Sequence, residues 1–126
     1  IFQIIRNDDR FSIIKNQSGL LSIMSKYKIG IFSFGITVCE AFHSGLPSIV
    51  LSHSHENDIY AKKIAMYDCM TYLGYFQKIN FHSIPEETFS LMRNRKLYKK
   101  YSDNGHKIID GKGSIRIAKR IAQLIR

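Results

Sequence analysis

Three short apolar segments, separated by two helical ones, limit the possible folds of this chain more than any other feature. The segments are 29–33, 48–52 and 70–73, and the first of them, Ile-Gly-Ile-Phe-Ser, is almost continuously apolar. Such runs are typical of strands that are buried on both faces of a parallel sheet. Between the runs, the spacing of apolar residues predicts helices over 36–44 and from about 58 to 67. Strands that alternate with helices form βαβ units, so we predict an α/β fold with a parallel sheet flanked by helices.

The N-terminal residues predict two further strands and a short helix. Runs rich in β-branched and aromatic residues at 2–5 and 11–14 are readable as strands, and the polar residues 7–10 between them predict a turn. Ser18 is a typical N-cap residue and predicts a helix over about 19–27.

From residue 84 onward the pattern becomes helical. Residues 84–87 predict a helix start, followed by apolar residues spaced for one face: Phe89, Met92, Leu97 and Tyr101. The segment 110–114, Asp-Gly-Lys-Gly-Ser, predicts a break and the cap of a final helix over 115–125. The apolar stripe of that helix is Ile117, Ile121 and Leu124. We therefore expect one α/β domain over residues 1–126 with a helical C-terminus.

Composition excludes several classes of protein. The chain has 126 residues, of which 44% are hydrophobic and only two are proline, so it can bury a core and is unlike a disordered chain. No apolar run approaches the roughly 20 residues that span a bilayer. Cys39 and Cys69 have no zinc or redox spacing, and we expect free thiols in a reducing cytoplasm. Because the sequence begins at Ile1 without an initiator methionine, we expect it to belong to a longer, two-domain protein.

The net charge of +9 predicts an anionic partner. From Ser83 onward there are eleven Lys and Arg against four Asp and Glu, so most of the excess is C-terminal. The candidate partners are nucleic acid, an acidic membrane surface and a phosphorylated small molecule. We do not expect nucleic acid, because these cations fall on the polar faces of amphipathic helices, where exposure to water is ordinary. Peripheral contact with the inner face of a membrane stays open.

The segment 33–40, Ser-Phe-Gly-Ile-Thr-Val-Cys-Glu, carries the most chemical information. It predicts a strand end, a tight turn at Gly35 and a helix start, which in a parallel sheet places free N–H groups and a helix dipole where ligands bind. Gly35 would let a phosphate approach the backbone, Thr37 could add a hydroxyl, and Glu40 could accept hydrogen bonds from ribose. An ordinary strand–turn–helix connection explains the same residues equally well.

A second polar loop favours a binding site. Residues 52–58, Ser-His-Ser-His-Glu-Asn-Asp, follow the next strand and should therefore line the same edge of the sheet. His53 and His55 lie one residue apart and would chelate a metal poorly by themselves, so we expect no metal and no cofactor.

From residue 17 onward the sequence resembles the C-terminal domain of GT-B nucleotide-sugar enzymes. The resemblance is greatest to the UDP-sugar hydrolase of pseudaminic acid biosynthesis and its spore-coat polysaccharide relatives, and then to the UDP-N-acetylglucosamine transferase of peptidoglycan synthesis. Four segments carry it: the loop and helix start at 34–40, Gly-Leu-Pro and an apolar strand at 45–50, His-Glu-Asn-Asp at 55–58, and Asp-Gly-Lys-Gly-Ser-Ile-Arg at 110–116.

The resemblance implies a Rossmann-like domain that is the GT-B C-terminal half and holds a UDP-sugar or another nucleotide-sugar. It would be the binding half of a hydrolase or a glycosyltransferase in surface polysaccharide synthesis. Its partner would be the N-terminal domain of the same protein, which would supply the catalytic residues, so we assign none here. The substrate-binding residues implied are Ser33, Phe34, Gly35, Ile36, Thr37, Glu40, His55, Glu56, Asn57 and Asp58.

Three residues depart from the family pattern. Phe34 and Ile36 replace small residues before Thr37, and Asp58 stands where an amide is usual. Phe34 would narrow a phosphate cleft, and Asp58 would place a negative charge beside one. The alternative is therefore a non-catalytic domain that keeps the fold, has a degenerate nucleotide site, and acts in protein or anionic-membrane interaction.

Overall fold

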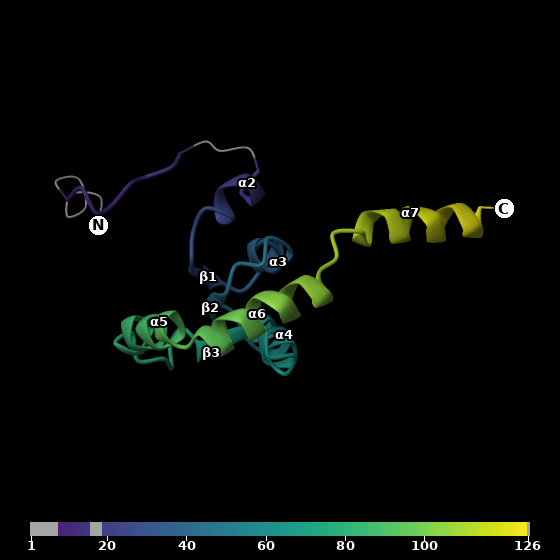
Figure 1. Ribbon diagram of the computed structural model, residues 1–126. Helices are drawn as coiled ribbons and strands as arrows, with labels where there is room; N and C mark the ends of the chain where they lie inside the picture. The colour runs from purple at the N-terminus through teal and green to yellow at the C-terminus, as the bar shows by residue number, and fades with distance from the viewer. Residues whose placement is uncertain (1–7, 16–18, 126) are drawn as a thin grey trace.

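The chain forms a three-stranded parallel sheet surrounded by helices (Figure 1), in a computed structural model that describes residues 8–15 and 19–125. The strands are β1 (Gly30–Ser33), β2 (Ser48–Ser52) and β3 (Met70–Tyr75), and they lie in that order across the sheet. The helices are α2 (Leu21–Met24), α3 (Ile36–His43), α4 (His55–Ala65), α5 (Ser83–Arg93), α6 (Arg95–Ile108) and α7 (Gly113–Leu124). The predicted α/β class, the Rossmann-like parallel sheet and the helical C-terminus are confirmed.

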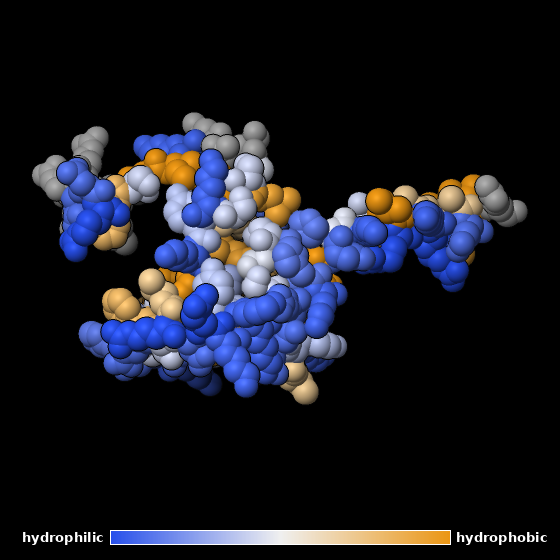
Figure 2. Space-filling view, viewed as in Figure 1, coloured by the Kyte–Doolittle hydropathy of each residue, from blue (hydrophilic) through white to orange (hydrophobic). Residues whose placement is uncertain are grey.

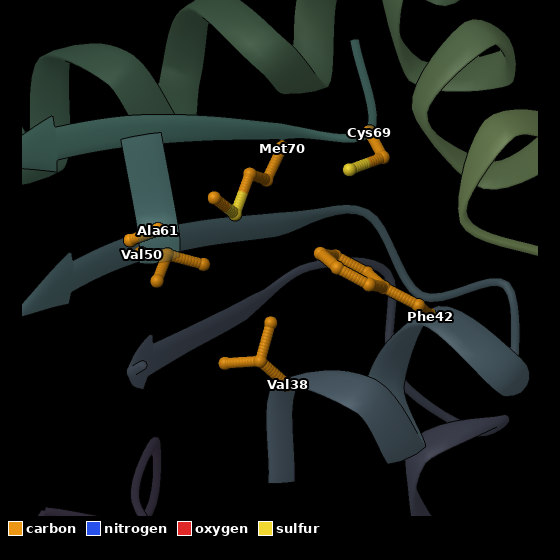
Figure 3. Close-up of a cluster of buried hydrophobic side chains, with 6 residues drawn as sticks. All are labelled: Val38, Phe42, Val50, Ala61, Cys69 and Met70. Atoms are coloured by element: carbon orange, nitrogen blue, oxygen red, sulfur yellow. The ribbon is translucent and has the colours of Figure 1, made fainter. Parts of the chain in front are cut away.

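The main hydrophobic core lies between the sheet and the pair α3 and α4. Right-handed βαβ crossovers between strands in sequential order place both connecting helices on the same face. Val38 and Phe42 of α3 point toward the sheet, where they meet residues of β2, α4 and the start of β3 (Figure 3). The buried members of this cluster are Val38, Phe42, Val50, Ala61, Cys69 and Met70.

The opposite face of the sheet is covered less completely. Side chains alternate along a strand, so Ile49 points away from Val50, and α5, with its buried Leu91, packs against β2 and β3 on this side. Ile31 in β1 is 50% exposed, because β1 pairs only with β2 among the described residues. The prediction that 29–33 is buried on both faces is therefore wrong.

Helix α6 runs across the amino ends of the strands. The Tyr98 hydroxyl donates to the carbonyl oxygen of Lys28, just before β1, at 2.8 Å. The Asn104 amide donates to the carbonyl oxygens of Tyr67 and Asp68, just before β3, both at 3.0 Å. Gly105 lies so close to α3 that an added Cβ would meet the Phe42 backbone at 3.2 Å. The amino edge of the sheet is thus closed by α6, which leaves the carboxyl edge uncovered by this helix.

The two connecting helices follow the sequence closely, with one shift. Helix α3 ends as predicted at Gly45, whose φ of +71° lets the chain close a Schellman motif, with the Leu46 N–H donating to the Ala41 carbonyl. Helix α4 begins at His55, three residues before the predicted start. The reason is Ser54, whose hydroxyl accepts a hydrogen bond from the Asn57 N–H and caps the helix.

Two predictions near the N-terminus are wrong and two lie outside the described residues. Residues 11–14 form no strand, and the side chains of Phe11, Ile13 and Ile14 are exposed. Instead of a helix over 19–27 there is the single turn α2, with Leu20 at its N-cap. The strand predicted over 2–5 and the cap predicted at Ser18 fall on residues that the structure does not describe.

The C-terminal pattern divides into three helices. Asn94 separates α5 from α6 because its side chain accepts the Leu97 N–H and caps α6, so the predicted common face does not exist. Phe89 and Met92 are exposed, and Leu91 is the residue of α5 that enters the core. The final helix, predicted over 115–125, is α7. Among the helices of residues 8–15 and 19–125, none has the length and apolar character needed to cross a bilayer.

Candidate functional site at the carboxyl edge of the sheet

Hydrogen bonds join the turn after β1 to the turn after β2. Ser33 Oγ and His53 Nδ1 share a hydrogen bond of 2.6 Å. The Asn57 side-chain amide donates to the carbonyl oxygen of Phe34 at 3.2 Å and lies 3.4 Å from His53 Nε2. His53 therefore bridges the two turns, although the sequence placed it outside the candidate site. The link also fixes the backbone around Gly35, which begins the next helix.

The N-terminus of α3 is open, whereas that of α4 is capped. No side chain in the described part of the chain caps α3, while Ser54 caps α4. A Cβ added to Gly35 would meet no atom within 4 Å apart from those of its chain neighbours, so other described residues leave that side of the glycine open. The first N–H groups of a helix have no partner inside it and carry a partial positive charge. The α3 turn can therefore accept an anion through its backbone.

A β-bulge in β3 brings two tyrosines to the same side of the sheet. Val50 pairs with Tyr72, but the next residue of β2, Leu51, pairs with Gly74, so Leu73 is the extra residue. Without the bulge, Tyr72 and Tyr75 would point to opposite faces, because they lie three residues apart. With it, Tyr75 stacks on His55 with ring centroids 4.8 Å apart, and Tyr72 reaches the start of α4.

The Asp58 carboxylate is fully engaged within the protein. It accepts hydrogen bonds from the Tyr72 hydroxyl at 2.5 Å and from Lys62 Nζ at 2.6 Å. These two bonds, that from Lys62 first, hold the pKa of Asp58 below its usual value. Burial and then the bond to Asp58 raise the pKa of Tyr72 to about 12. Tyr72 also lies 2.8 Å from Ser52 Oγ, so its bonds tie α4 to the ends of β2 and β3. Asp58 acts here as a structural residue, and Lys62 balances its charge.

Phe34 does not obstruct the turn, because its half-buried side chain packs against the core beside Val38. Two departures from the family pattern were expected to weaken a phosphate site, Phe34 and Asp58. Phe34 packs in the core, and Asp58 is bonded to Tyr72 and Lys62. Ile36 is different: it is 82% exposed at the first position of α3 and nothing in the structure explains its apolar side chain there.

The remaining predicted residues are not all brought together. Glu40 and Ile36 line a separate cavity of about 180 Å³ between α3, α2 and the connection from α6 to α7. Thr37 is half-buried in the first turn of α3, and Glu56 is exposed in the first turn of α4. The other residues around the small cavity are Leu21, Cys39, His43, Ile109 and Gly111. The proposed ribose contact, Glu40, therefore lines a cavity to which Ser33, His53 and Asn57 do not contribute.

Two kinds of reactive group are in question among the described residues, a metal-binding cluster and an activated thiol. No group of three or more His, Cys, Asp or Glu side chains within the described ranges converges on a point where a metal ion could be held. Burial, and then the nearby Glu40 carboxylate, raise the pKa of the Cys39 thiol, which disfavours a nucleophilic thiolate. The edge presents an uncapped helix turn beside the hydrogen-bonded side chains of Ser33, His53 and Asn57.

Sequence reasoning missed Tyr72, Tyr75 and the bridging role of His53. One signal was present, because a glycine inside a strand often marks a bulge, and Gly74 has a φ of +113°. Nothing in the sequence indicated that His53 would bond to Ser33, since twenty residues separate them and only the parallel pairing of β1 with β2 brings them together.

Larger hollows exist elsewhere on the surface. Two open concavities of about 770 and 840 Å³ lie along α5 and α6, and their walls carry Arg93, Arg95, Lys96, Lys99 and Lys100. Lys99 and Lys100 are paired with Asp103 and Asp68, respectively. These hollows are distant in the fold from the carboxyl edge, because α6 lies at the amino ends of the strands.

Comparison of the sequence with protein-family models and with curated proteins finds no match, and comparison of the fold with solved structures finds none either.

Proposed function

We propose that the carboxyl edge of the sheet binds the diphosphate of a nucleotide-sugar, with a UDP-sugar as the first candidate. In this proposal the chain is the nucleotide-binding half of a sugar-nucleotide hydrolase or glycosyltransferase of surface polysaccharide synthesis. The observation that carries it is the open, uncapped N-terminus of α3 in front of Gly35. Such a turn in a parallel α/β sheet offers N–H donors and a helix dipole to phosphate oxygens.

The surroundings of the turn suit a diphosphate. One of the two carboxylates in the first turn of the neighbouring helix, Asp58, is already paired with Lys62 and bonded to Tyr72, so its repulsion of a phosphate is reduced. Ser33, His53 and Asn57 form a hydrogen-bonded set that holds the turn in shape. The net charge of +9 favours the approach of an anion from solution.

The proposal rests on the α3 turn and not on Glu40, which lines the separate small cavity. It places the chain in a reducing cytoplasm, where Cys39 and Cys69, both free thiols, stay reduced. The anion held at the turn would be the leaving nucleoside diphosphate, whose growing negative charge the helix N-terminus would stabilise during transfer or hydrolysis.

The decisive experiment removes one backbone donor from the turn. Ile36 is the first residue of α3, a position at which proline is tolerated and where Gly35 has the extended backbone that a following proline prefers. Ile36→Pro deletes the N–H, while the matched variant Ile36→Ala removes the same exposed side chain and keeps the N–H. Binding of UDP is measured on the labelled chain by NMR chemical-shift titration.

We expect Ile36→Pro to weaken UDP binding by about tenfold or more, as for one charge-assisted hydrogen bond, and Ile36→Ala to bind as the parent does. Pyrophosphate should compete with UDP, and uridine should not. Equal affinities for the two variants, or no shifts near Gly35 with millimolar UDP, CDP or GDP, would overturn the proposal. The alternative, a non-catalytic domain with a degenerate site, would then be favoured.

Glu40 is tested separately in the same titration. If ribose reaches this residue, Glu40→Ala weakens UDP binding and leaves pyrophosphate binding unchanged. If the variant affects neither ligand, Glu40 belongs to the small cavity alone and the diphosphate site stands without it.

A further inference from the structure

Helix α7 lies outside the packed body of the molecule. It extends away from the sheet and the other helices (Figure 1), and none of its residues is buried. Within the described residues, it makes no extensive packing contact with another helix or strand. Its apolar residues are therefore presented to solvent, with Leu124 being 72% exposed. An apolar helix face of this kind is normally covered by something.

The side chains of α7 are sorted into two faces. At about 100° per residue, its isoleucines, alanines and leucine fall on one half of the helix and its cations on the other. Figure 2 shows this division, with hydrophobic residues along one side of the projecting helix and hydrophilic ones along the other. The apolar half holds Ile115, Ile117, Ala118, Ile121, Ala122 and Leu124, and the polar half holds Arg116, Lys119, Arg120 and Gln123. No acidic residue occurs in α7.

The connection that carries α7 is held to the body. The His43 ring nitrogen Nδ1 hydrogen bonds with the Ile109 carbonyl at 3.1 Å, and Gly111, with a φ of +72°, passes directly against the same ring. Asp110 pairs with Arg116 at 2.5 Å and accepts the Lys112 N–H at 2.9 Å. These contacts fix the turn before α7 beside α3. They therefore set the direction in which α7 leaves the rest of the molecule.

The charge of α7 decides which partner fits best. A second copy of the chain, with a net charge of +9, would bring cations against cations along the flanks of the apolar stripe. An anionic bilayer matches both faces of α7. Its apolar interior can cover the isoleucines and leucine, and its negative headgroups can pair with the lysine and arginines. A helix of 12 residues, about 18 Å long, can lie in that boundary with its lysine and arginine side chains extended toward the headgroups.

We propose that α7 binds the surface of an anionic membrane, lying in the interface with its stripe of Ile117, Ile121 and Leu124 inserted. The helix is a peripheral attachment site, separate from the carboxyl edge of the sheet. Its binding should therefore not depend on a nucleotide.

The absence of tryptophan from the sequence allows a direct test of insertion. Leu124→Trp places one fluorophore on the stripe, and Met66→Trp, at a residue that is 83% exposed at the end of α4, serves as the matched control. Each is mixed, in the full chain, with vesicles of phosphatidylcholine alone or with phosphatidylglycerol added. The emission at position 124 should shift to the blue only with the anionic vesicles, and the emission at position 66 should not shift.

A second measurement separates insertion from simple attraction between charges. Vesicle flotation is compared for Ile121→Asp in α7 and Ile59→Asp in α4, which are matched in residue type and in exposure, 51% and 54%. Ile121→Asp should lower the partition onto anionic vesicles by more than tenfold, and Ile59→Asp should lower it far less. Replacing Lys119 and Arg120 by glutamine should lower it by about fivefold for each cation removed, equivalent to about 1 kcal/mol.

Because α7 makes no extensive packing contact with another described helix or strand, its variants should fold like the parent, and circular dichroism checks this for them and for the α4 controls. Membrane binding is overturned if the chain does not float with anionic vesicles, or if Ile121→Asp floats as well as the parent, since the attraction is then purely electrostatic. It is also overturned if Leu124→Trp shifts to the blue without vesicles at raised protein concentration, because the stripe is then covered by a second copy.

Discussion

Helices α3 and α7 both carry an apolar stripe, yet only α3 has its stripe covered by the same chain. In α3, Val38, Ala41 and Phe42 are buried against the sheet and α6, whereas in α7 no residue is buried. Both helices show apolar residues at helical spacing, but α3 is mostly apolar and has no lysine or arginine, whereas α7 has three of these cations on one half. Amphipathic spacing predicts that a helix has a face to cover, and it does not say whether the covering surface belongs to the same chain.

The largest expected difference between the two regions comes from truncating a buried ring. Phe42→Ala should lower the free energy of unfolding by about 3–5 kcal/mol, because it opens a cavity between α3, the sheet and α6. Leu124→Ala in α7 should change it by less than about 0.5 kcal/mol. Urea unfolding followed by circular dichroism measures both. A loss of more than about 2 kcal/mol for Leu124→Ala would show that α7 packs against the other helices or the sheet, and would contradict the contrast between α3 and α7.

A smaller difference is expected for two glycines in helices. An added Cβ at Gly105 of α6 would meet Phe42 atoms at 3.2–3.3 Å, and Gly105→Ala should therefore cost about 1–3 kcal/mol. At Gly113 of α7 an added Cβ meets no described atom within 4 Å, so Gly113→Ala should be close to neutral. The same unfolding measurement checks the pair, and equal costs would contradict the close approach of α6 to α3.

Capping serines give a third, still smaller contrast. Ser54 caps α4 through the Asn57 N–H, and Ser54→Ala should cost about 1 kcal/mol of stability. Ser114 is exposed in the first turn of α7 and has no cap bond, so Ser114→Ala should have almost no effect. Since the cap also positions the start of α4, backbone amide shifts at residues 55–57 should change in Ser54→Ala. If those shifts stay as in the parent, the early start of α4 has another cause.

The last contrast is a dependence of stability on alkaline pH, which we expect from Tyr72 beside the sheet and which α7, having no tyrosine, does not share. The pKa of Tyr72 is raised from its ordinary value of 10.0 to about 12 in the folded chain, chiefly by burial and by the Asp58 carboxylate. A raised pKa means that this contribution is fully present below pH 10 and is lost as the pH rises toward 12. Stability should fall over that range in the parent and less in Tyr72→Phe. The exposed Tyr60 provides the control, and Tyr60→Phe should behave as the parent does.

The βαβ core was predictable because its signals are local and strong. The apolar runs at 48–52 and 70–73 became β2 and β3, and Gly45 closed α3, since each follows from the polarity or the backbone freedom of the residues themselves. The strand expected at 11–14 did not form. A β-branched run becomes a strand only when another strand pairs with it, and in the described part of the chain none does.

The sequence predicted which segments lie at the carboxyl edge of the sheet, but it did not predict the hydrogen bonds between their side chains. The turn at Gly35 and residues 52–58, which form the end of β2, a short turn and the start of α4, do lie at one edge of the sheet, as the carboxyl ends of parallel strands must. The partners at that edge were not predictable, because Ser33 meets His53, and Tyr72 meets Asp58, only through strand pairing and the bulge at Gly74. Glu40, one turn along α3, was assigned to the same site from the resemblance, yet together with Ile36 it lines a separate small cavity.

The sequence by itself determined that this chain has buried parallel strands, helices between them, an excess of positive charge and a final helix with two unlike faces. These properties follow from the composition of the chain and from the spacing of apolar and charged residues along the sequence. Only the tertiary structure decided that α6 closes the amino edge, that Asp58 is bonded to Tyr72, and that no described residue buries the stripe of α7. Each of these depends on which distant residues the chain brings into contact, and that is set by the packing of whole elements rather than by any local pattern.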